Sequence, residues 1–85
     1  MQAYEVVLHE RAWEVLASLG ATERRRLLGV LERLKADPFH VGDFRERDQT
    51  GRPNEVWLVE EWLVTYWTDH AGHEIRVVNL ERVED

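Results

Sequence analysis

With 85 residues, 44% of them hydrophobic, and no cysteine, the chain forms one small domain, residues 1–85, and its composition excludes a disulfide framework or a thiolate metal site. The net charge of −6 lies entirely in the second half, where Asp43–Asp85 carries eleven acidic and five basic residues, and this argues against a broad nucleic-acid surface because such affinity rests on neutralising phosphates. No apolar run approaches the ~20 residues of a membrane span and the first residues lack a signal-peptide pattern, so we expect a cytoplasmic protein without a membrane partner.

The first elements in chain order are a strand and a helix. Residues Ala3–His9 alternate in hydrophobicity and are rich in β-forming side chains, which predicts a strand. From Glu10 the apolar period changes to that of one helix face, which predicts that the following side chains are buried: Ala12, Trp13, Leu16 and Leu19. Gly20 is placed to end this helix.

A second helix follows at once. Thr22 is placed to cap its start. Its predicted buried stripe consists of Leu27, Val30, Leu31 and Leu34. The triple arginine Arg24–Arg26 points in several directions around the helix, so we interpret it as a solvated helix surface rather than a nucleic-acid patch. The helix is predicted to end at Asp37-Pro38, since proline stops its continuation.

The second half of the chain is β-rich. Phe44–Asp48 is either a short strand or a loop, and Thr50–Asn54 has the composition of a turn. The apolar stretch Glu55–Trp67 predicts a hairpin, and a last strand follows the turn Asp69–His73. Because these late connections are short, the late strands should be antiparallel. The predicted fold class is therefore α+β: an N-terminal strand, a two-helix hairpin, and an antiparallel β-meander packed on the helices.

The hairpin has apolar side chains on both faces. With Glu60-Glu61 as a two-residue loop, one face carries Glu55, Trp57, Val59, Trp62, Val64 and Tyr66. The other face carries the predicted partner-binding residues, which are Val56, Leu58, Leu63, Thr65 and Trp67. The helical hairpin can cover only one face. The opposite face is either capped by the chain ends or left for a partner.

Side chains able to do chemistry are few. His70 and His73 lie in one turn without enough further ligands for zinc, so no metal and no cofactor is predicted. The hairpin aromatics are either a base-stacking platform or core and interface residues. The arginines of the second half either gather to hold a phosphate or an acidic partner, or pair with nearby glutamates in solvent; they are Arg45, Arg47, Arg52, Arg76 and Arg82.

Two segments of the chain resemble those of a known family. The segment LKADP, Leu34–Pro38, is similar to a Leu-x-x-Asp-Pro motif, and VEEWLVTY, Val59–Tyr66, stands where that family carries V-G-D-Y-R-V-I-Y. Together with the predicted element order, they resemble the RelE/ParE toxins of bacterial toxin-antitoxin pairs over nearly the whole chain. The resemblance implies their fold and a cognate antitoxin protein as partner.

The resemblance also implies an activity and its residues. RelE-like members cut messenger RNA in the ribosomal A site without a metal, using basic side chains on the sheet face away from the helices. By this resemblance Arg82, and after it Arg47, are the predicted catalytic residues. The family places arginine or lysine at positions matching Val56, Leu58 and Leu63, which are aliphatic here, and no tyrosine follows Arg82.

Two hypotheses therefore stand open. In the first, the chain is a toxin-like ribonuclease or growth inhibitor that acts on the ribosome and messenger RNA and is held by its antitoxin. In the second, it has the same fold without nuclease chemistry and uses the apolar sheet face to form a homodimer or to bind another protein.

Overall fold

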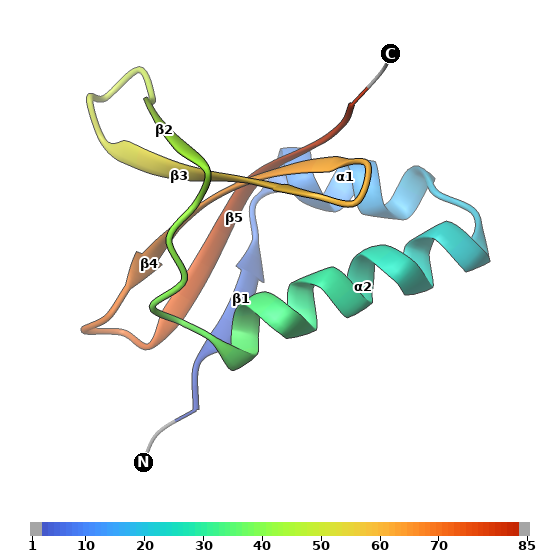
Figure 1. The fold of residues 1–85 in the computed structure, drawn as a ribbon, viewed down its shortest axis with the longest axis horizontal. Coiled ribbons are helices and arrows are strands. Elements are labelled where there is room, and N and C mark those ends of the chain that lie inside the picture. Colours follow the sequence, from blue (N-terminus) through green and yellow to red (C-terminus); the bar gives the residue numbers. More distant parts are fainter. Residues whose placement is uncertain (1–2, 84–85) are drawn as a thin grey trace.

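Seven elements follow one another in the computed structural model, which describes residues 3–83. In chain order they are β1 (Glu5–Leu8), α1 (Glu10–Ser18), α2 (Ala21–Ala36), β2 (Phe44–Arg47), β3 (Pro53–Val59), β4 (Trp62–Asp69) and β5 (Glu74–Arg82). This order confirms the predicted α+β fold, and the doubtful segment after the helices is strand β2. Both helices lie against one face of the sheet (Figure 1). Neither is long and apolar enough to span a membrane.

The sheet has five strands in the order β1-β5-β4-β3-β2. The last four strands form the predicted antiparallel meander. Strand β1 pairs with β5 in parallel, with Glu5 opposite Glu74 and Leu8 opposite Val77. A parallel pair needs a long crossover connection. Here the connection along the chain from β1 to β5 consists of the helical hairpin and the first three strands of the meander. The sheet is mixed, since it combines this parallel pair with the antiparallel meander.

The hairpin of β3 and β4 has the predicted register, with Val59 opposite Trp62 and Glu55 opposite Tyr66. Its two-residue loop holds Glu60 at a φ of 56°, a left-handed conformation that non-glycine residues adopt at some cost. The carbonyl of Glu61 accepts a hydrogen bond from the Val83 amide at 2.8 Å. This bond ties the hairpin loop to the end of β5.

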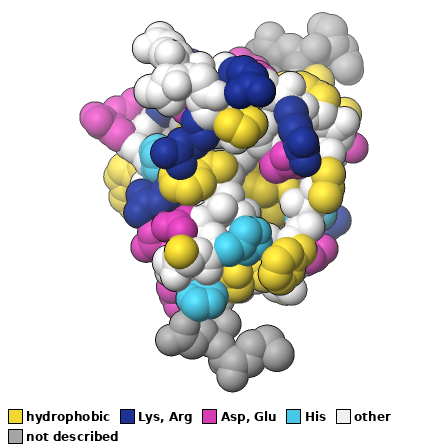
Figure 2. All heavy atoms as spheres, turned by 90° about the vertical axis from the view of Figure 1, so that its left-hand side faces the viewer, with side chains coloured by type: hydrophobic (Ala, Val, Ile, Leu, Met, Phe, Trp, Pro, Cys, Tyr) yellow, Lys and Arg dark blue, Asp and Glu magenta, His cyan; other side chains and the backbone are white. Residues whose placement is uncertain are grey.

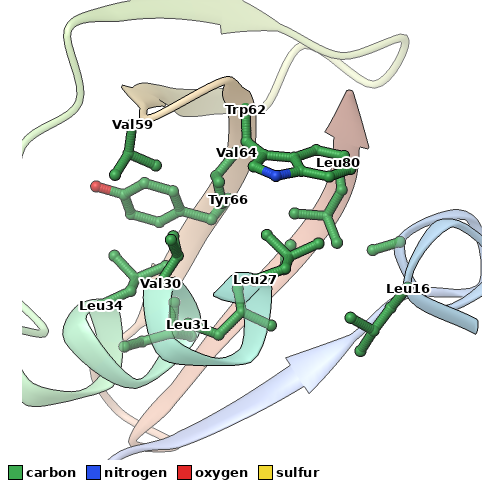
Figure 3. Close-up of a cluster of buried hydrophobic side chains, with 13 residues drawn as sticks. Leu16, Leu27, Val30, Leu31, Leu34, Val59, Trp62, Val64, Tyr66 and Leu80 are labelled. Atoms are coloured by element: carbon green, nitrogen blue, oxygen red, sulfur yellow. The ribbon is translucent and has the colours of Figure 1, made fainter. Parts of the chain in front are cut away.

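The core lies between α2 and one face of the meander (Figure 3). All four residues of the predicted α2 stripe are buried: Leu27, Val30, Leu31 and Leu34. They pack against the hairpin residues Val59, Trp62, Val64 and Tyr66, which Figure 3 shows directed toward the helix. Every second residue of the hairpin strands therefore packs against the residues that repeat every 3.6 positions along α2. These are the two side-chain periods that a strand and a helix are expected to show.

The prediction that Trp13 belongs to the core is wrong. Its side chain is 58% exposed, whereas Ala12 and Leu16 of the same helix are buried. The buried stripe of α1 continues through the half-buried Val15 and Leu19. One residue step turns a helix by about 100°. Since the stripe runs along positions 12, 15, 16 and 19, position 13 faces outward.

The junction of the two helices also differs from prediction. Helix α2 begins at Ala21 with Gly20 as its N-cap and no side-chain cap, so Thr22 does not have the predicted role. Arg24 is not simply solvated: its guanidinium donates to the Leu19 carbonyl at 2.7 Å and to the Leu16 carbonyl at 3.4 Å. A cation is favourable at the carbonyl end of a helix. Arg24 thus joins the end of α1 to the start of α2.

Replacing Gly42 by alanine is expected to lower the free energy of unfolding by about 1–3 kcal/mol. A Cβ atom there would lie 2.7 Å from the Val56 carbonyl oxygen and 2.8 Å from its amide nitrogen. Both atoms belong to the backbone of β3 and cannot turn aside. Urea denaturation of Gly42→Ala measures the loss.

Gly29→Ala is the matched control, because a Cβ at this position of α2 meets nothing within 4 Å. Alanine is a better helix former than glycine, so this variant should gain up to about 1 kcal/mol. Equal effects of the two substitutions would contradict the close approach at Gly42.

Candidate functional site

The sheet face opposite the helices, called the open face below, has no helix of residues 3–83 lying over it. Its middle row runs across the strands as Phe44, Val56, Thr65 and Asn79. The next row consists of Leu58, Leu63 and Glu81. On the other side of the middle row lie Trp67, Arg76 and Val7. All five predicted partner-binding residues therefore lie on this one face.

These five residues are not equally accessible. Leu58 is 50% exposed, and Leu63 and Trp67 are half-buried. Val56 and Thr65 are only 2% and 6% exposed. They lie in the middle row, between the row of Leu58 and Leu63 on one side and the row of Trp67 on the other. Leu58, Leu63 and Trp67 are thus the ones that a partner could reach.

Phe44 enlarges the accessible apolar surface beyond the predicted set. It lies opposite Val56 on the edge strand β2, and half of its side-chain surface is exposed. Just before β2 begins, the Asp43 carboxylate accepts a hydrogen bond from the Leu58 amide at 2.7 Å. The backbone amide of Leu58 therefore already has a hydrogen-bond acceptor. A partner at this point of the open face would contact side chains.

Trp67 marks a basic end of the open face. The Arg52 guanidinium carbon lies 3.9 Å from the centre of the Trp67 ring, and that of Arg76 lies 5.8 Å from it. Arg76 also pairs with the Glu74 carboxylate at 2.6 Å. Both guanidinium groups are close enough to the indole for a cation–π contact.

Arg82, the first predicted catalytic residue, lies on the helix side of the sheet. It pairs with the carboxylates of Glu23 in α2 and of Glu61 in the hairpin loop, the latter at 3.3 Å. Its guanidinium carbon is also 4.7 Å from the ring centre of Trp62, which faces the core. Two carboxylates neutralise this arginine in the structure.

Arg47, the second predicted catalytic residue, lies elsewhere. It is opposite Pro53 and donates to the Gly51 carbonyl at 2.8 Å, in the turn between β2 and β3. Arg82 is opposite Trp62, at the other end of the hairpin. The two positions are roughly 20 Å apart along β3, from the rise per residue of a strand. The structure does not bring these arginines together, and their catalytic role stays a prediction.

A hydrogen-bonded pair formed by the buried Tyr66 and the partly buried His40 joins the connector after α2 to the core. The Tyr66 hydroxyl donates to the His40 carbonyl at 2.9 Å, and its oxygen lies 2.8 Å from His40 Nδ1. Because the hydroxyl has one proton, Nδ1 must be the donor in the second bond. Burial raises the pKa of Tyr66 above its ordinary value, and the carboxylates of Glu55, Asp37 and Asp43 raise it further.

The sequence analysis did not predict the contact between His40 and Tyr66. Residues that are 26 positions apart carry no local signal of contact. The other histidines form no metal centre: residues 3–83 contain no group of three or more histidine, aspartate or glutamate side chains placed to hold an ion.

Comparisons with known proteins begin with two negative findings. No protein-family model matches the sequence, and no curated protein sequence matches it. Solved structures do match. A chain of the archaeal RelE-RelB complex from Pyrococcus horikoshii OT3 has a TM-score of 0.70 at 18% identity, over 95% of this chain and 96% of that one. The isolated Escherichia coli RelE toxin has a TM-score of 0.69 at 16% identity, over 98% and 87%.

The chain has the RelE fold. A third structure, the toxin-antitoxin complex RelBE2 from Mycobacterium tuberculosis, agrees at a TM-score of 0.69 and 19% identity, over 95% of this chain and 99% of that one. On this RelE fold, the three positions where the resemblance implied basic residues all lie on the open face. They are the aliphatic Val56, Leu58 and Leu63.

Proposed function

We propose that this chain is the toxin-like component of a toxin-antitoxin pair, and that it acts by binding a protein rather than by cutting RNA. The fold supports the first part, since similar structures include RelE in complex with RelB and the intact Escherichia coli RelBE toxin-antitoxin complex. The antitoxin of this chain covers the open face.

The observation that carries the proposal is the accessible apolar surface of the open face. Leu58 and Phe44 each leave 50% of their surface exposed, next to the half-buried Leu63 and Trp67. Soluble monomers rarely expose a contiguous apolar patch unless it binds something. An antitoxin segment that buries these side chains removes them from water, at a gain of roughly 25 cal/mol for each Å² of apolar surface.

Cleavage of messenger RNA on the ribosome is the competing proposal, and it rests on the resemblance alone. It requires a cluster of cations to stabilise the charge that develops on the phosphate. Arg82 is held by Glu23 and Glu61, and Arg47 lies at the other end of the hairpin. This arrangement favours a toxin that binds its target.

Induction of the protein in a bacterium tests both proposals. We expect growth arrest with intact messenger RNA, and we expect Arg82→Ala to arrest growth as the parent does. Co-expression of the antitoxin should end this arrest in the parent but not in Leu63→Arg, because the substitution places an unpaired charge in the antitoxin contact. Leu28→Arg is the matched control, since Leu28 is 44% exposed on α2, on the helix side of the molecule.

The position of the messenger RNA ends, mapped by sequencing, decides between the two. Codon-positioned cuts that disappear in Arg82→Ala would establish the ribonuclease and overturn the binding proposal. A second measurement is the affinity for the product of an adjacent antitoxin-like gene, which Leu63→Arg should weaken roughly tenfold or more. Light scattering of the protein alone tests the homodimer as the other occupant of this face.

A further inference from the structure

A second surface meets the open face at Trp67 and lies at the end of the sheet formed by the start of β3 and the end of β4. It is a hollow of about 400 Å³, called the basic hollow below, and the connector after α2 forms its other wall. The side chains relevant to binding are Arg45, Arg52, His40, His70, Phe39 and Trp67. Figure 2 views this end of the molecule and shows basic, histidine and hydrophobic side chains close together.

Arg45 enters the basic hollow in a fixed position. Its Nε pairs with the Glu55 carboxylate at 2.6 Å, and the other carboxylate oxygen accepts the Gly42 amide at 2.7 Å. Both oxygens of Glu55 are therefore occupied. The pairing uses only the Nε of Arg45, and within residues 3–83 no hydrogen bond or ion pair engages its two terminal nitrogens.

Arg52 supplies a second cation to the basic hollow, and no carboxylate within residues 3–83 forms an ion pair with its side chain. Its guanidinium carbon lies 3.9 Å from the centre of the Trp67 ring, so a cation–π contact holds this cation beside the basic hollow. The nearby Asp48 carboxylate is engaged by the Thr50 hydroxyl at 2.6 Å and by the Arg52 amide at 2.9 Å. The bond from the Thr50 hydroxyl is the main cause that lowers the pKa of Asp48.

His70 and Phe39 form the opposite wall. Their rings are stacked at 4.7 Å and 14°, and the Tyr4 hydroxyl bonds to His70 Nδ1 at 2.8 Å. The Nε2 of His70 has no partner within the described residues. The basic hollow therefore joins two guanidinium groups and an imidazole to exposed aromatic surface, and with neutral histidines its lining has one net positive charge.

We infer that the basic hollow binds a phosphate group carried on a planar ring, as in a nucleoside monophosphate. The terminal nitrogens of Arg45 and the guanidinium of Arg52 hold the phosphate, because guanidinium groups match its oxygens in charge and geometry. The planar ring stacks on the aromatic wall. The volume lies within the range of small-molecule sites, roughly 300–1,000 Å³.

This site adjoins the proposed antitoxin contact at Trp67, which lines both surfaces. The substitutions that test each proposal lie apart from this shared residue: Arg45 and Arg52 for the basic hollow, and Leu63 for the antitoxin contact. Each set of variants should therefore affect its own activity, and the two proposals fail separately.

Calorimetric titration of the purified protein with adenosine monophosphate tests the inference. We expect saturable binding that is weaker for adenosine and for ribose 5-phosphate, since each lacks one half of the recognised group. In a nuclear magnetic resonance spectrum of the backbone and indole N–H groups, the Trp67 indole signal should shift on titration. The Trp13 signal, from an exposed side chain on α1, should not.

Arg45→Ala and Arg52→Ala should each weaken binding roughly tenfold or more, because each removes a charge-assisted contact. Arg25→Ala, on the exposed surface of α2, is the matched control and should bind as the parent does. Thermal melts verify that every variant is folded; the turn at Arg52 uses its backbone amide, which alanine keeps.

A short 5′-phosphorylated RNA identifies the source of the phosphate. Tighter binding of this RNA than of the mononucleotide assigns the basic hollow to a strand end, and equal affinity assigns it to free nucleotides. No saturable binding of either at millimolar concentration overturns the inference, as does binding that both arginine variants leave unchanged.

Discussion

Leu27→Ala is expected to lower the free energy of unfolding by about 2–5 kcal/mol. Leu27 is fully buried in α2, against the hairpin residues Trp62 and Val64 (Figure 3). Alanine removes the apolar surface and leaves a cavity, because the rigid sheet cannot collapse onto the helix. Small domains are stable by only about 5–15 kcal/mol in total. This single change therefore removes a large share of the stability, which urea denaturation measures.

Leu28→Ala gives the matched comparison one position along the same helix. Leu28 is 44% exposed, so its removal should change the stability by no more than about 0.5 kcal/mol. A loss at Leu28 as large as that at Leu27 would mean that α2 presents a different face to the sheet.

Tyr66→Phe is expected to cost about 1–3 kcal/mol, although it removes a single oxygen atom. The Tyr66 side chain is 1% exposed, and its hydroxyl bonds to both the carbonyl and Nδ1 of His40. Phenylalanine leaves the His40 carbonyl and Nδ1 without this partner, beside a buried ring. Tyr4→Phe is the control, because the Tyr4 hydroxyl bonds to the exposed His70 and water can replace it.

The same hydroxyl predicts how stability depends on alkaline pH. Burial raises the pKa of Tyr66 in the folded protein, while the unfolded chain has the ordinary value of about 10. Above that pH the unfolded state binds fewer protons than the native state, so the free energy of unfolding falls as pH rises. The contribution is complete below about pH 10 and is lost above it. Tyr66→Phe should show a shallower decline above pH 10 than the parent.

The sequence predicted the hairpin of β3 and β4 correctly because its signals are local. The alternation of apolar side chains and the two-residue loop at Glu60-Glu61 together define one register. The α2 stripe was equally clear, since its leucines and valine repeat with the helical period. In α1 the same argument failed at Trp13. A large apolar residue beside the stripe satisfies the pattern, and only the packing of α1 on the sheet shows that it faces outward.

The sequence did not predict the contacts between segments that are distant along the chain. The alternation around Val6 predicts a strand, but not that it pairs with β5 in parallel. Nothing local to Arg82 indicates that Glu23, 59 positions away, neutralises it. The five predicted partner-binding residues do share one side of the sheet, the open face, and their binding role stays a prediction. Their accessibility was not predictable, because the burial of Val56 and Thr65 depends on larger neighbours from other strands.

The parallel pairing of β1 with β5 also has a consequence for how the chain folds during synthesis. Within residues 3–83, β1 has one sheet neighbour, β5, which is made after the other strands of the sheet. Contacts of such high sequence separation form slowly, because a long loop must close before they contribute. A growing chain can assemble its helical hairpin and much of the meander, but its sheet stays incomplete until β5 has emerged. The native surfaces, the open face among them, therefore become complete only after β5 has been made.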